Sequence, residues 1–117
     1  MNMGGARQRH YSPFALWGPI LEMPGIRFVN LQYADAEEDL AAAKARGIDI
    51  WTPPGIDLKM DLDDLAALCA ALDVVMGPST ATTNIAAAVG ARVFLSAGPG
   101  CWTGFGSDQA PCYPSAR

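Results

Sequence analysis

Four hydroxyl side chains cluster where the sequence predicts a turn from a strand into a helix. Ser79, Thr80, Thr82 and Thr83 follow a short apolar run at residues 74–76. A run of this kind, rich in β-branched residues, suits a buried parallel strand. The first turn of the helix that follows offers unpaired N–H groups and the positive end of a dipole, which together bind phosphate. The stretch therefore predicts an anion site.

The same hydroxyls have a purely structural interpretation. Ser and Thr in front of a helix are ordinary N-caps, and capping alone explains Ser79 and Thr80. The helix itself has small side chains, and Ala86, Ala87 and Ala88 let it pack close to a sheet. Gly90 suits a left-handed C-terminal cap. Both interpretations stay open at this point.

Strand and helix signals alternate along the rest of the chain. Strands are predicted at residues 26–33, 48–51, 74–76 and 93–96. Helices are predicted from Ser12 with a kink at Gly18-Pro19, from Asp35 to Arg46, from Asp61 to Leu72, and up to Gly90. This alternation predicts an α/β fold: a Rossmann-like, three-layer parallel sheet of about four strands with helices on both faces.

In such sheets, ligands bind beyond the carboxyl ends of the strands. Those ends correspond to residues 32–35, 53–60, 77–83 and 98–102. The hydroxyl cluster therefore shares one predicted edge with Gln32, Asp35, Lys59 and Met60.

Composition limits the function classes. Of the 117 residues, half are apolar and 17% are charged, which predicts one globular domain at 12–117 after a flexible polar tail at 1–11. A net charge of −4 argues against nucleic-acid binding, and no apolar run approaches a membrane span. Three cysteines without Cys-x-x-Cys spacing predict a reducing, cytoplasmic location, and a single His argues against a metal site.

Four segments, in order, carry a resemblance to a known family. They are residues 28–33, 61–68, 73–90 and 112–117. Together they resemble the heptosyltransferases and, more closely, the glycosyltransferase-like domains that follow tetratricopeptide repeats. The resemblance covers most of the chain from Trp17 onward. It implies the nucleotide-sugar-binding, C-terminal half of a glycosyltransferase of the GT-B type.

The resemblance also implies roles for the residues at the edge. The donor diphosphate would lie on the helix start formed by Ser79, Thr80, Ala81 and Thr82, with Asn84 one turn on.

Two further segments have implied roles. Lys59 and Met60 match a Lys-Met pair whose Met lies on the nucleotide base in the family. The segment from Asp35 to Glu38 stands where the family has an acid near the ribose hydroxyls, and Gln32 belongs to the same predicted strand end. The structural alternatives are a core Met60, a solvated Lys59 and a helix-capping Asp35.

The chain departs from the family pattern in two ways. Ser79, Ala81 and Asn84 replace the heptosyltransferase Asp, Gly and His, so carboxylate- or imidazole-dependent chemistry cannot be carried over, and no catalytic base is assigned. The first, central strand of the family's domain is also absent. We therefore expect a fragment lacking its N-terminal half or upstream repeats, inactive alone, with open sheet edges that favour self-association.

The leading hypothesis is thus the donor-binding half of a glycosyltransferase, with a nucleotide-diphosphate sugar as substrate and no separate cofactor. The alternative is a non-catalytic α/β remnant that acts as a binding or assembly module. A generic dinucleotide binder is disfavoured, because no Gly-x-Gly-x-x-Gly follows a strand.

Overall fold

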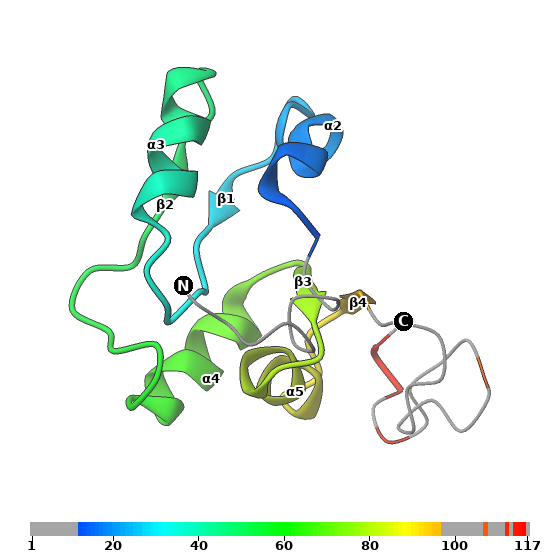
Figure 1. Ribbon diagram of the computed structural model, residues 1–117. Helices are drawn as coiled ribbons and strands as arrows, with labels where there is room; N and C mark the ends of the chain where they lie inside the picture. The colour runs from blue at the N-terminus through cyan, green and yellow to red at the C-terminus, as the bar shows by residue number, and fades with distance from the viewer. Residues whose placement is uncertain (1–11, 97–106, 108–111, 113, 117) are drawn as a thin grey trace.

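The computed structural model describes residues 12–96, 107, 112 and 114–116, in which helices alternate with short strands (Figure 1). The predicted tail at 1–11 and the predicted strand end at 98–102 lie outside these residues. In chain order the elements are η1 (Phe14–Trp17), α2 (Gly18–Leu21), β1 (Phe28–Val29), α3 (Glu37–Ala45), β2 (Ile50–Trp51), α4 (Leu62–Ala71), β3 (Val75–Pro78), α5 (Ala81–Ala88) and β4 (Val93–Ser96). No helix in the described ranges has the length and apolar character needed to cross a bilayer.

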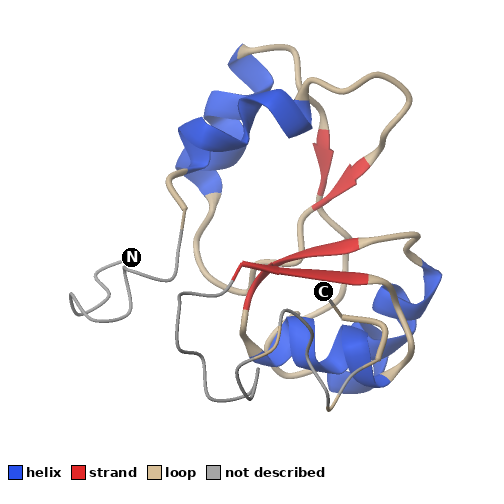
Figure 2. Ribbon diagram, turned by 90° about the vertical axis from the view of Figure 1, so that its right-hand side faces the viewer, coloured by secondary structure: helices blue, strands red, loops and turns tan. Residues whose placement is uncertain are grey.

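The strands form two separate parallel pairs. In one pair Phe28 of β1 lies opposite Ile50 of β2, and in the other Val75 of β3 lies opposite Val93 of β4. Figure 2 shows the two pairs running in different directions. The predicted α/β class and parallel pairing are confirmed, but the prediction of one three-layer sheet of four strands is wrong. Among the described strands, none lies between the pairs to join them.

The first two strands are shorter than predicted because residues at their ends form hydrogen bonds within adjacent turns. After β1, the Asn30 side chain accepts a hydrogen bond from the Gln32 N–H (3.0 Å), which turns the chain out of the strand. Before β2, the Ile48 N–H donates to the Ala43 carbonyl (3.0 Å), so Ile48 belongs to the end of α3. Gly47, at φ +78°, allows that turn.

The third strand, predicted at residues 74–76, begins one residue later and continues through Gly77 and Pro78. The Val75 N–H donates to the Arg92 carbonyl, so Val75 is one of the residues of β3 that bond to β4. Because such residues alternate along a strand, the backbone N–H and C=O positions of Met76 and Pro78 point away from β4. A proline on that open edge removes no bond to β4.

The helix starts combine correct and incorrect predictions. The chain does change helix type at Gly18, with Pro19 in the first turn of α2, but Pro13 rather than Ser12 precedes η1. Asp61 holds the N-cap position of α4, where the helix was predicted to begin, but its side chain makes no capping hydrogen bond. Ala36, not Asp35, holds that position in α3.

The core lies in the second half of the chain. Figures 1 and 2 show α4 and α5 together on one side of the β3–β4 pair. Leu65 and Cys69 of α4 pack there with Val75, Val93 and the small residues of α5. Leu31, just after β1, packs against this cluster from the first half.

Candidate functional site

The turn between β3 and α5, predicted as an anion site, is held together by its own hydroxyl groups. The Thr80 N–H donates to Thr83 Oγ1 (2.9 Å), and the same hydroxyl donates to the Pro78 carbonyl (2.8 Å), with the Thr80 carbonyl at 3.1 Å as a second acceptor. The two threonines form a reciprocal capping box. Thr83 is 3% exposed. Its hydroxyl therefore serves the helix start, as the structural interpretation predicts.

The other predicted anion ligands vary in access. Ser79 and Ala81 are exposed, Thr80 and Asn84 are half-buried, and Thr82 is buried. Whether an anion binds their N–H groups stays a prediction. Among the described residues, no side-chain nitrogen or oxygen atom that is completely shielded from solvent lacks a hydrogen-bond partner.

Lys59 and Met60 lie in a turn organised by Asp57. The Asp57 carboxylate accepts hydrogen bonds from both of their N–H groups, at 2.9 and 3.1 Å, while the Asp57 N–H donates to the carboxylate of Asp61 (2.9 Å). Met60 is 71% exposed, so the alternative of a core Met60 is wrong. The exposed Lys59 fits the alternative of a solvated charge.

Asp35 and Gln32 also make hydrogen bonds within local turns. Asp35 accepts a hydrogen bond from the Glu37 N–H (3.0 Å) at the start of α3, and the Gln32 N–H donates to Asn30. Because the two strand pairs are separate, their carboxyl ends do not form one continuous edge. The structure thus brings together Thr80 and Thr83, whereas Gln32, Asp35 and the Lys59–Met60 pair lie in other local turns.

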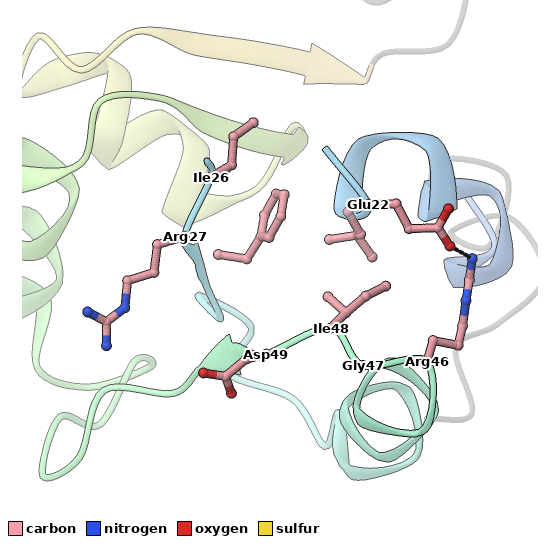
Figure 3. Close-up of a pocket in the computed structure, with 9 residues that line it drawn as sticks. Glu22, Ile26, Arg27, Arg46, Gly47, Ile48 and Asp49 are labelled. Carbon is pink, nitrogen blue, oxygen red and sulfur yellow. Dashed lines mark hydrogen bonds and ion pairs between the residues drawn. The ribbon is translucent and has the colours of Figure 1, made fainter. Parts of the chain in front are cut away.

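An open depression lies elsewhere, between α2, β1 and the end of α3, with a volume of about 640 Å³. Figure 3 shows Ile48 directed into it, whereas Arg27 and Asp49 point away on the other side of the strands. The Arg46 guanidinium forms an ion pair with Glu22 at its rim. The depression therefore has a mixed lining, with apolar side chains such as Ile48 inside and the paired charges of Glu22 and Arg46 at its rim.

Sequence reasoning missed this ion pair, because Glu22 and Arg46 are 24 positions apart and follow the ends of two different helices. The glycine at position 18 was the one sequence feature that could have indicated the position of Arg46. A Cβ there would lie 2.8 Å from the Arg46 guanidinium, so the missing side chain leaves room for the arginine to cross α2.

The described residues offer neither a cluster of metal ligands nor an activated thiol. They include no group of three His, Cys, Asp or Glu side chains placed to hold a metal ion. Burial raises the pKa of the Cys69 thiol above its usual 9.0, so it stays protonated at neutral pH and behaves as a core group.

The β3–β4 pair has one face whose described side chains are largely exposed, which we call the outer face. It carries Val74, Met76, Pro78, Arg92, Phe94 and Ser96. Residues of the opposite face, such as Val75, Gly77 and Val93, are buried against the helices. On the outer face Phe94 is 46% exposed, Met76 42% and Val74 39%. Parallel sheets are normally covered on both faces, so this exposure is unusual.

A comparison with known proteins finds one strong relative. The whole chain is 53% identical, over 118 residues, to Protein FlbA of Caulobacter vibrioides. The match spans only 20% of FlbA. No family model matches the chain, and no solved structure does.

These findings overturn the glycosyltransferase hypothesis. A relative that aligns over the full chain carries no glycosyltransferase name, and no glycosyltransferase family or structure matches. The heptosyltransferase-like assignment and nucleotide-sugar binding as the function are therefore wrong. The physical reason is that a strand, a hydroxyl-rich turn and an alanine-rich helix meet ordinary folding needs, as the capping by Thr80 and Thr83 demonstrates.

Proposed function

We propose that this chain is a non-catalytic α/β module that binds other segments of a longer, FlbA-like polypeptide and helps to assemble it. The observation that carries the proposal is the nature of the described surface. Large apolar side chains stand exposed on it, whereas the Asp35 carboxylate and the Thr83 hydroxyl are hydrogen-bonded within local turns. Apolar surface rimmed by polar residues is typical of protein interaction sites.

The relative supplies the context. FlbA contains a region 53% identical to the whole chain, and four fifths of FlbA lies outside that region. Assembly partners are therefore available in one polypeptide, where tethering raises their effective concentration.

The test is to mix the purified chain with Caulobacter FlbA from which the matched 118 residues have been deleted. We expect a one-to-one complex by light scattering coupled to size-exclusion chromatography. Intact FlbA is the matched control and should form no complex, because its own copy of the region occupies the binding surfaces. Absence of any complex with the deleted FlbA at about 100 µM of each, a concentration that detects weak binding, contradicts the proposal.

A further inference from the structure

The sequence of β3 and β4 indicates that the outer face is covered in the assembled protein. A strand with one face in water alternates apolar and polar residues, whereas a strand covered on both faces reads as a continuous apolar run. Residues 74–76 are Val-Val-Met and residues 93–95 are Val-Phe-Leu. Val74, Met76 and Phe94 thus occupy positions where alternation would place polar residues, and they are exposed.

The size of the outer face argues for one helix as its cover. Strands of four residues are about 13 Å long, and two strands with their side chains are about 10 Å across. One α-helix has that diameter, and about nine residues of it span that length. A stable dimer interface buries about 800 Å² per partner, so a second copy of the chain would need much more surface than this.

The edge of β3 that pairs with no described strand is poorly suited to an added strand. A strand docking at this edge would bond to outward-directed backbone groups of β3, and Pro78 lacks an N–H at one of those positions. The Pro78 carbonyl already accepts the Thr83 hydroxyl (2.8 Å). The edge is therefore a poor template for strand pairing, while the face beside it stays open.

The positive charge of Arg92 indicates which side chain a covering helix should carry. Arg92 is exposed on the outer face and forms no ion pair with another described residue. The other members of this face are uncharged. A carboxylate on the covering helix would neutralise Arg92 as it becomes buried, which a second basic group would oppose.

We propose that the outer face docks one amphipathic α-helix of the same longer polypeptide, with an apolar stripe over Met76 and Phe94 and a carboxylate against Arg92. This inference rests on the proposed function and specifies the surface and the partner.

The experiment uses a chimera in which this chain replaces the matched region of Caulobacter FlbA, so that the helix is tethered as in the relative. Peroxide oxidation of Met76 is followed by mass spectrometry in the chimera and in the isolated chain. Met60 is an internal control, because it is more exposed and lies in the loop before α4. We expect Met76 to oxidise at least tenfold more slowly in the chimera, with Met60 unchanged.

Variants of the chimera test the chemistry. Arg92→Glu should restore fast oxidation of Met76, and Arg92→Lys should keep the protection. Circular dichroism of each variant checks that the fold is intact.

Two outcomes overturn the inference. Met76 that oxidises equally fast in the chimera and the isolated chain shows that nothing covers the face. Slow oxidation in the isolated chain, together with dimers in light scattering, assigns the face to a second copy. In either case a complex of the chain with deleted FlbA leaves the proposed function intact and removes only this surface from it.

Discussion

The hydroxyl of Thr83 makes its hydrogen bonds inside the turn that contains it. It accepts from the Thr80 N–H and donates to the Pro78 carbonyl, and so joins the end of β3 to the start of α5. Its methyl group lies near Gly77, where an added Cβ would be 3.4 Å away. The position of the hydroxyl cluster was predictable from the sequence, but its use was not, because capping and anion binding require the same residue types at the same place.

Thr83→Val should destabilise the protein. The substitution keeps the shape but removes both hydrogen bonds, and we expect a loss of about 1 to 3 kcal/mol in the free energy of unfolding. Urea denaturation followed by circular dichroism measures this loss. The matched control is Thr82→Val, at a buried neighbour whose side chain makes no hydrogen bond to another described residue. Equal losses for the two variants would show that the Thr83 hydrogen bonds contribute nothing specific.

At the scale of elements, the ends of α3 and α5 share one motif. The Gly90 N–H donates to the Ala87 carbonyl and the Ala91 N–H to the Ala86 carbonyl, which is the bonding pattern of a Schellman end. Gly47 ends α3 in the same way. Both helix ends were predicted correctly, because a glycine after an apolar-periodic segment is a local signal.

Strand ends were less predictable than helix ends. The strand at 93–96 was predicted with its correct bounds, whereas the predicted strand at 26–33 pairs only at Phe28–Val29. The bounds of β1 depend on which residues of β2 are free to pair, and Ile48 is engaged by α3 instead. The Glu22–Arg46 pair escaped prediction for a related reason, since it depends on packing between distant segments.

Gly90→Ala should cost about 1 to 2 kcal/mol of stability through backbone strain alone. Gly90 has φ +84°, and no atom lies within 4 Å of the position that a Cβ would take, so steric overlap makes no contribution. Gly90→Asn should lose less, because asparagine tolerates the left-handed conformation. Urea midpoints of the three proteins provide the ranking. An alanine variant as stable as the wild type would mean that the end of α5 rearranges without cost.

At the scale of the whole molecule, the two strand pairs differ in what supports them. Leu65, Cys69 and Val93 are fully buried around β3–β4, whereas β1 and β2 contain no buried residue. The alternation of strand and helix signals predicted parallel pairing, which follows from each crossover. Whether the pairs join into one sheet depends on contacts between distant segments, which periodicity does not encode.

Hydrogen exchange should reveal this difference as two levels of protection. The Val75 and Val93 amides bond to the Arg92 and Ser115 carbonyls within the core half, and the Asn30 amide bonds to the Trp51 carbonyl beside β1–β2. Local opening requires less free energy where fewer apolar contacts are broken, so Asn30 should exchange at least about tenfold faster by NMR. Ile48→Val, at a buried residue next to β2, should lower the local stability of the first strand pair by about 1 kcal/mol. The variant should therefore speed the exchange of the Asn30 amide without speeding that of the Val75 amide. If the variant accelerates both amides equally, the two halves unfold as one cooperative unit, and the separation of the strand pairs has no thermodynamic counterpart.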